Sequence, residues 1–306
     1  MTSLEKRQRH KEGHRSRVEQ ARIAAARARR RNRVLRILVG ILVVVLGVAV
    51  VAVLLQDDPP GDESADDATT TTDTTAPDDA GTTVPVTPVV LPPGPEGATI
   101  EGETPCPAED GSEERVAVFA QAPPTCIEEG QALVAEIAVD LVDDAGEATP
   151  AGTIVVELDA EAAPQAVNNF VVLSRYQFYD GIPFHRLVPD FVAQVGGSGA
   201  PGADGAPDYG TTGPGYDLED VEHPEDGYAV GDVAMARAET VSGSQFFIVT
   251  SESALQALDQ AGNYPRFGRV TEGLELAAEM ASQGDPATNG GPLALYVIRD
   301  ITIRPA

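Results

Sequence analysis

Arg186 and Gln194 are the side chains of this 306-residue sequence whose chemistry most needs an explanation. Both stand among apolar residues in the stretch PFHRLVPDFVAQVGG, residues 183–197, and burying a guanidinium is costly unless it has a partner or a task. Arginine stays protonated and is a strong hydrogen-bond donor. An arginine that an amide holds in an apolar cleft can stabilise a reacting group that gains electron density in its transition state.

The same stretch predicts the element that positions these side chains. Two short apolar runs flank Pro189 and the following aspartate, a pattern typical of a β-hairpin. If residues 189–191 form a three-residue loop, Arg186 lies opposite Gln194 on one face of the hairpin. Gln194 can then hold the guanidinium on the same face as the neighbouring valines.

The rest of residues 131–306 predicts many strands and two helices. The predicted strands are LVAEIAVDLV (133–142), TIVVELD (153–159), DVAMA (232–236), SQFFIVT (244–250) and LALYVIRDITI (293–303). The predicted helices are AAPQAVNNFVVLSRY (162–176), with its early proline, and residues 272–282. This mixture favours a mainly β fold, either a barrel or an α+β domain.

Several blocks of this region, taken in order, resemble the cyclophilin family of peptidyl-prolyl isomerases. They are FHRLVPDFVAQVGG (184–197), GTTGPGY (210–216), VAMARA (233–238), SGSQFFIVT (242–250) and RFGRV (266–270). The resemblance covers roughly residues 131–306 and is of the kind expected for a membrane-anchored bacterial, actinobacterial-like member. It implies a closed eight-stranded β-barrel capped by two α-helices.

The resemblance also implies a chemistry for Arg186. Rotation about an X–Pro bond is slow because amide resonance must be broken, which leaves a lone pair on the prolyl nitrogen. A donor aimed at that nitrogen stabilises the twisted state, and no metal or other cofactor is required. The implied catalytic residues are Arg186, Gln194, Phe191 and Phe247, and the implied substrate-binding residues are Val192, Ala236, Arg237, Gln245, Leu258 and Tyr264.

The sequence departs from the family pattern at three places. Arg237 stands where the family has asparagine, the chain has no tryptophan, and the loop 251–265 is longer than usual. Leu255 or Ala257 would replace the tryptophan that is linked to cyclosporin sensitivity, so we expect weak cyclosporin binding. Arg237 beside Arg186 favours acidic residues next to the target proline; alternatively, Arg237 points to solvent and pairs with Glu239.

Charge divides the chain around one apolar run. Residues 1–36 hold 13 Lys+Arg and 3 Glu, whereas the other 270 hold 8 Arg and 45 Asp+Glu, a net of −37. Between them lies ILVGILVVVLGVAVVAVLL, residues 37–55, long enough to span a bilayer. We expect a single-pass signal anchor at 34–55, a cytoplasmic basic segment at 1–33 and an exported body. A cleaved signal peptide is the alternative, and nucleic-acid binding is not expected.

Three further segments follow the apolar run. Residues 56–98, rich in Asp, Thr and Pro, are expected to form a disordered linker. Residues 99–130 form an extension in which Cys106 and Cys126 are expected to make one disulfide in an oxidising compartment. Residues 131–306 form the globular domain.

We therefore expect a prolyl isomerase that assists the folding of exported proteins at the outer face of the cytoplasmic membrane. The alternatives are a non-catalytic proline-binding module and a structural spacer whose pocket is occluded by residues 198–209. His185 is interpreted as structural because isomerisation transfers no proton. The G-x-G-x-x-G match at 197–202 runs into a loop rather than a helix, which argues against a dinucleotide site.

Overall fold

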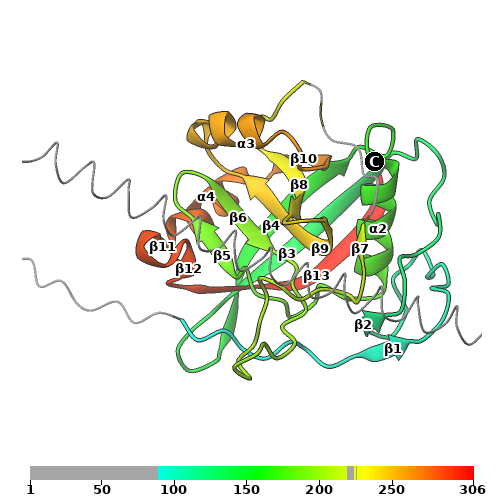
Figure 1. The fold of residues 1–306 in the computed structure, drawn as a ribbon, viewed down its shortest axis with the longest axis horizontal. Helices are drawn as coiled ribbons and strands as arrows, with labels where there is room; N and C mark the ends of the chain where they lie inside the picture. Colours follow the sequence, from blue (N-terminus) through cyan, green and yellow to red (C-terminus); the bar gives the residue numbers. More distant parts are fainter. Residues whose placement is uncertain (1–88, 219–223, 225) are drawn as a thin grey trace, which may run out of the picture. The chain divides into compact units, whose positions relative to one another are not determined.

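The computed structural model describes residues 89–218, 224 and 226–306 (Figure 1). The predicted basic segment, the predicted signal anchor and the linker up to residue 88 lie outside the described residues. Within the described ranges, no helix combines the length and the apolar character needed to cross a membrane.

One large antiparallel sheet dominates the described domain, in the order β13-β3-β4-β10-β8-β9-β6-β5, with β7 added beside β9. Its strands are β3 (Leu133–Val142), β4 (Ala148–Leu158), β5 (Arg186–Val188), β6 (Val192–Val195), β7 (Asp217–Leu218), β8 (Asp232–Arg237), β9 (Val241–Val249), β10 (Arg266–Glu272) and β13 (Leu295–Pro305). Short strands β11 (Gly284–Asp285) and β12 (Gly291–Pro292) pair separately. All of the strands predicted from the sequence are therefore present.

The two ends of this sheet meet through a short junction. β5 and β13 do not pair as strands, but the backbone N–H of Phe184 donates to the carbonyl of Tyr296 at 2.9 Å, and an isolated bridge joins Pro183 to Val297. Pro183 has no backbone donor, which limits the ladder at this point. The implied closed barrel is thus corrected to an eight-strand curled sheet, a half-barrel, whose ends touch over a few residues.

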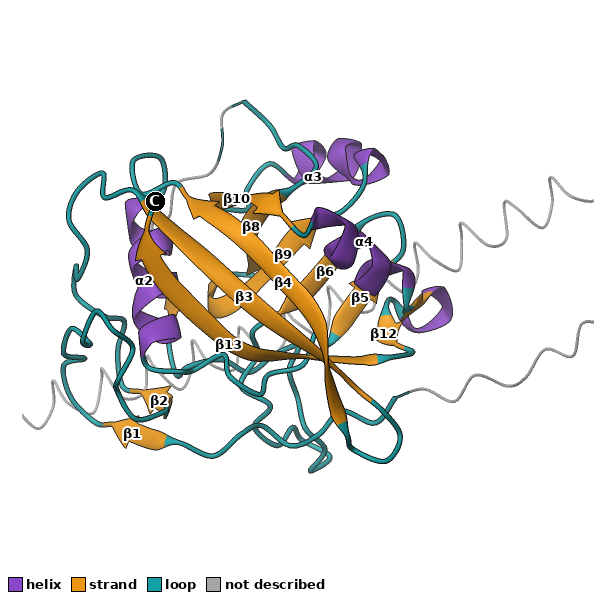
Figure 2. Cartoon of the chain, turned by 180° about the vertical axis from the view of Figure 1, so that it is seen from behind, coloured by secondary structure: helices purple, strands orange, loops and turns teal. Residues whose placement is uncertain are grey.

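In the part of the chain that the structure describes, three α-helices accompany the sheet: α2 (Pro164–Arg175), α3 (Leu255–Ala261) and α4 (Leu274–Ser282). α2 and α4 match the two predicted helices and lie on opposite sides of the sheet in both views (Figures 1 and 2). α3 was not predicted: it lies inside the expected loop 251–265, follows a short 3₁₀ turn (Glu252–Ala254) and ends at Gly262 with φ 62°. A second 3₁₀ turn is Pro286–Thr288.

Aromatic side chains from α2 and the strands form the main core. Phe170 of α2 lies 5.4 Å from Phe246 of β9 and 5.1 Å from Phe267 of β10, measured between ring centroids. Each such pair contributes about 0.5–1.5 kcal/mol beyond its buried area. The core fixes β9, whose other face carries Phe247.

The extension before residue 131 belongs to this core. Its strands β1 (Ala98–Ile100) and β2 (Val116–Phe119) are parallel, and Phe119 is 1% exposed. The guanidinium of Arg115 donates to the backbone carbonyls of Phe178 and two neighbouring residues. The extension is therefore an integral layer of the domain.

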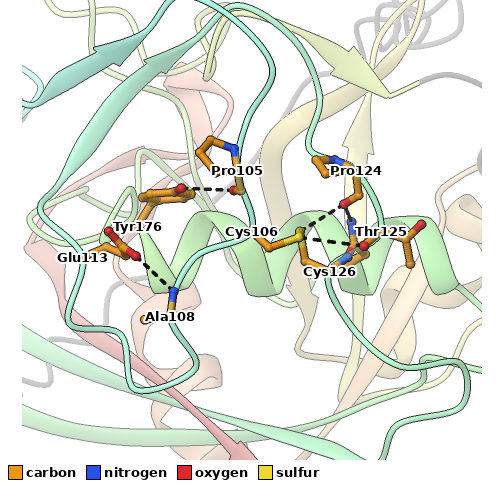
Figure 3. Close-up of a disulfide and its surroundings, with 9 residues drawn as sticks. Pro105, Cys106, Ala108, Glu113, Pro124, Thr125, Cys126 and Tyr176 are labelled. Carbon is orange, nitrogen blue, oxygen red and sulfur yellow. Dashed lines mark hydrogen bonds between the residues drawn. A yellow bond between two sulfur atoms is a disulfide. The ribbon is translucent and has the colours of Figure 1, made fainter.

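The predicted disulfide between Cys106 and Cys126 is confirmed, and it closes the extension against α2 (Figure 3). The side chain of Asn168 on α2 accepts a hydrogen bond from the backbone of Cys126 at 2.6 Å and donates to the carbonyl of Pro124 at 2.8 Å. The hydroxyl of Tyr176 donates to the carbonyl of Pro105 at 3.0 Å. Both arms of the disulfide loop are thus held by the end or the face of one helix.

Residues 89–98, predicted as linker, lie along the domain instead. The backbone N–H of Val89 donates to the carbonyl of Pro292 at 3.2 Å, and the hydroxyl of Tyr209 donates to the carbonyl of Pro92 at 3.1 Å. The structure differs from the linker prediction for these ten residues, which are mostly apolar, because they have backbone partners and Leu91 packs against the core.

Candidate active site

The hairpin β5–β6 has the predicted register. Arg186 pairs with Gln194 and Val188 with Val192, which leaves residues 189–191 as the loop. Asp190 adopts φ 56°, a left-handed conformation that aspartate tolerates better than most residues. The three-residue loop therefore brings the guanidinium and the amide together, and Arg186 Nη1 donates to Gln194 Oε1 at 3.2 Å.

Beside this pair lies a cavity of about 450 Å³, named here the arginine cavity. It is lined by Arg186, Phe191, Val192, Gln194, Ala236, Arg237, Phe247, Ala257, Leu258, Tyr264 and Asn289. Every residue predicted for the catalytic and substrate-binding groups is in this lining except Gln245. The segments that contribute are the β5–β6 hairpin, β8, β9, the α3 region and the turn after residue 288.

Gln245 lies behind the wall of the cavity and acts on it through Gln194. The side-chain amide of Gln194 donates to Gln245 Oε1 at 3.1 Å, and Gln245 Nε2 donates to the carbonyls of Gly210 at 3.1 Å and Thr212 at 3.3 Å. These hydrogen bonds give Gln245 a positioning role, and the predicted contact with substrate stays a prediction. The hydrogen bonds that link the side chains of Gln245, Gln194 and Arg186 fix the direction of the guanidinium.

Asn289 is the cavity residue that the sequence did not indicate. Its Oδ1 accepts a hydrogen bond from Arg186 Nη2 at 3.5 Å, and its backbone has φ 57°. The two residues are 103 positions apart, so no local pattern links them. The Arg186 guanidinium is therefore held by an amide on each side.

Burial lowers the pKa of the Arg186 guanidinium, and the nearby Tyr264 opposes this shift. The arginine nevertheless stays charged at neutral pH because its ordinary pKa is far above 7. Two neutral amides, rather than a carboxylate, accept its hydrogen bonds. The guanidinium therefore keeps its full positive charge, and its remaining N–H groups can donate hydrogen bonds to a ligand in the arginine cavity.

The floor of the cavity is apolar. Val192, Phe247 and Leu258 are 1%, 4% and 3% exposed and belong to a small cluster separate from the main core. The ring of Tyr264 packs edge-on against Phe247 at 5.3 Å, and the Tyr228 hydroxyl fixes Tyr264 through two backbone bonds of 2.8 Å. The position of α3 thus brings Leu258 to the cavity, together with Ala257, as the sequence predicted for this region.

His185 faces away from the arginine cavity. Among the described residues, neither ring nitrogen has a hydrogen-bond partner, and the ring stacks on Tyr209 with a centroid distance of 6.1 Å. Burial, and then the charge of Arg186, lower the pKa of His185 to about 4, so the ring is neutral at pH 7. This placement agrees with the structural interpretation of His185.

A second cavity of about 630 Å³ adjoins the first and shares Arg186 and Asn289 with it. Residues of the loop 198–209 line this second cavity, but none of them lines the arginine cavity. The expectation that this loop occludes the pocket is therefore wrong for the described residues.

Comparisons with known proteins agree with this geometry. The family described as "Cyclophilin type peptidyl-prolyl cis-trans isomerase/CLD" matches residues 145–303. Peptidyl-prolyl cis-trans isomerase B of Bacillus subtilis is 41% identical over 134 residues, which cover 43% of this chain and 85% of that protein. A peptidyl-prolyl cis-trans isomerase of Helicobacter pylori is 39% identical over 141 residues, 45% of this chain and 78% of the relative. Peptidyl-prolyl cis-trans isomerase-like 1 of Mus musculus is 38% identical over 155 residues, 48% and 88%.

Proposed function

The chain belongs to the cyclophilin-type peptidyl-prolyl cis-trans isomerases, and we propose that Arg186 is its main catalytic residue. We also propose that the enzyme acts on exported proteins at the outer face of the cytoplasmic membrane. The observation that carries the catalytic part is the Arg186 guanidinium, held by two neutral amides at the wall of a cavity whose floor is apolar. Proline-containing peptides are the substrates that the family implies.

Arg186 would act on the nitrogen of the prolyl amide. Uncatalysed rotation takes about 10–100 s because the barrier is about 18–20 kcal/mol. As the bond twists, the nitrogen gains a lone pair that a planar amide does not offer. An N–H of the guanidinium then donates to this nitrogen only in the twisted state, which is the differential binding that catalysis requires.

The other lining residues would hold the substrate. Val192, Phe247 and Leu258 give the proline ring a dry seat, which strengthens any hydrogen bond made beside it. Gln194 fixes the direction of the guanidinium, and the amide of Gln194 would also bond the substrate backbone. Phe191 and Ala236 complete the wall of the cavity. Arginine is better suited than lysine here, because its planar fork can bond both amides and still present a donor.

The test is the turnover of an Ala-Pro peptide by the full chain in a non-ionic detergent. We expect Arg186→Ala to lower kcat/KM at least ten-fold, about 1.4 kcal/mol of transition-state stabilisation. The matched control is Arg304→Ala, because Arg304 pairs with Glu136 on a distant part of the sheet. If a folded wild type isomerises no peptide but binds proline peptides, the protein is the non-catalytic module instead.

The proposed location rests on the sequence. The apolar run 37–55, the basic segment before it and the acidic body after it follow the positive-inside rule, and the Cys106–Cys126 disulfide suits an oxidising compartment. A reporter enzyme that works only outside the cytoplasm, fused after residue 306, should be active. It should lose activity when residues 37–55 are deleted; a reporter that is inactive on the intact chain would refute this location.

A further inference from the structure

The arginine cavity carries positive charge without any acidic residue. Arg186 and Arg237 both line it, and among the described residues no aspartate or glutamate is in the lining. This is unusual in a chain whose residues after 36 hold 8 Arg against 45 Asp+Glu. A cationic cavity in an anionic body selects for ligands of negative charge, because the acidic groups that dominate the rest of the body repel them.

The arginines elsewhere in the described domain are neutralised or enclosed. Arg266 and Arg269 pair with the buried Asp232, and Arg299 and Arg304 pair with carboxylates of β3. Arg115 is enclosed by backbone carbonyls, and Arg175 is buried. The two arginines of the cavity differ from these, because neither makes an ion pair with any described residue and both line a cavity that a ligand can enter.

Arg237 is the exposed member of the pair. It ends β8, directly after Ala236 in the cavity wall, and its side chain has no hydrogen bond or ion pair within the described ranges. Glu239, the neighbour that could neutralise it, is exposed on the same turn but does not pair with it. The charge of Arg237 is thus available at the rim of the cavity.

We propose that Arg237 is a specificity-determining residue, and that the arginine cavity prefers prolyl peptides with an aspartate or glutamate next to the proline. This inference rests on the proposed function. When the proline ring occupies the apolar floor, a flanking side chain lies at the rim, where Arg237 and the outer edge of Arg186 present their donors. A carboxylate there gains two positive neighbours, whereas a lysine is repelled by both.

The expected preference is moderate because Arg237 is exposed. An exposed ion pair changes binding roughly two- to five-fold, so Glu should exceed Gln by this factor. Exchanging attraction for repulsion about doubles the free-energy difference, so Glu should exceed Lys by roughly four- to twenty-five-fold. Added salt should reduce both ratios, since the screening length falls from about 10 Å at 0.1 M to about 3 Å at 1 M.

The experiment measures kcat/KM of the full chain at low and at high salt. One set of peptides has Glu, Gln, Lys or Ala directly before the proline, and a second set has the same residues directly after it. Each value is divided by that of the Ala peptide for the same protein variant. Arg237→Gln should bring the Glu/Lys ratio toward one, and Arg237→Glu should invert it. Arg304→Gln removes the same charge at a distant site and should leave the ratio unchanged.

The outcomes separate this inference from the proposed function. A preference for Glu in either set that Arg237→Gln abolishes supports the inference. Turnover of the Ala peptide with equal rates for Glu and Lys in both sets overturns the inference alone, as does a preference that Arg237→Gln retains. Absence of turnover for every peptide overturns the proposed function and the inference with it.

Discussion

Asn289 offers the sharpest test of how the guanidinium is directed. Its Oδ1 is the second acceptor of Arg186, at 3.5 Å, opposite the Gln194 bond of 3.2 Å. Hydrogen bonds to charged groups contribute about 1.5–3 kcal/mol at good geometry, and this one is at the long limit. We therefore expect Asn289→Gly to lower kcat/KM on Ala-Pro roughly two- to ten-fold, about 0.4–1.4 kcal/mol.

Asn289→Ala separates this effect from folding. The backbone at this position has φ 57°, which glycine adopts freely and alanine only at a cost of about 1–2 kcal/mol. Both variants lose the acceptor, so both should lose the same activity, while only Asn289→Ala should lose that much stability in urea unfolding. Unchanged kcat/KM in Asn289→Gly, or activities that follow stability rather than the missing amide, would refute the positioning argument.

Three more expectations can be measured directly. Replacing Cys106 and Cys126 by serine should lower the free energy of unfolding by about 3 kcal/mol, since the two residues are 20 positions apart, and the reduced wild type should match the variant in denaturant titrations. Burial lowers the pKa of His185 to about 4, from a value near 6.5 in the unfolded state, so between these pH values the unfolded state binds more protons than the folded state. As pH falls from 6.5 to 4, the free energy of unfolding of the wild type should therefore drop by up to about 3 kcal/mol relative to that of His185→Gln. Burial raises the pKa of Asp180 to about 6, so its titration stabilises the fold as pH falls, but it does so equally in both proteins. If the difference in unfolding free energy between wild type and His185→Gln does not change with pH, the burial argument is contradicted. Cyclosporin should bind weakly because Ala257 supplies only a methyl group to the cavity, and a tight complex by calorimetry would disprove this.

The site was predictable wherever local spacing determines geometry. A loop of residues 189–191 forces Arg186 to face Gln194, and the strand alternation puts Phe246 in the core and Phe247 in the cavity, so both could be inferred from the sequence. Asn289 could not be inferred, because its contact with Arg186 depends on how distant turns pack.

The extension and α3 were missed for other reasons. Residues 99–130 look polar, but three of their few large apolar residues, Val116, Phe119 and Ile127, enter the core. α3 has only seven residues and begins after a 3₁₀ turn, so its periodicity is too short to distinguish from a loop. The hydrogen bond between Gln245 and Gln194 could not be inferred either, because the sequence shows that a side chain faces a site but not which side chain lies next to it.

The hairpin that carries Arg186 is also the last strand pair of the sheet, and its outer edge is covered. The backbone N–H of Leu187 donates to the carbonyl of Gly290 at 2.7 Å, and a Cβ on Gly290 or Gly284 would collide with the Leu187 carbonyl. An uncovered edge would add extended chains as new strands, which is the route to aggregation for a protein that handles unfolded polypeptides. Because the β5 edge is covered in the described structure, an extended peptide bound in the arginine cavity cannot pair with this edge as an additional strand.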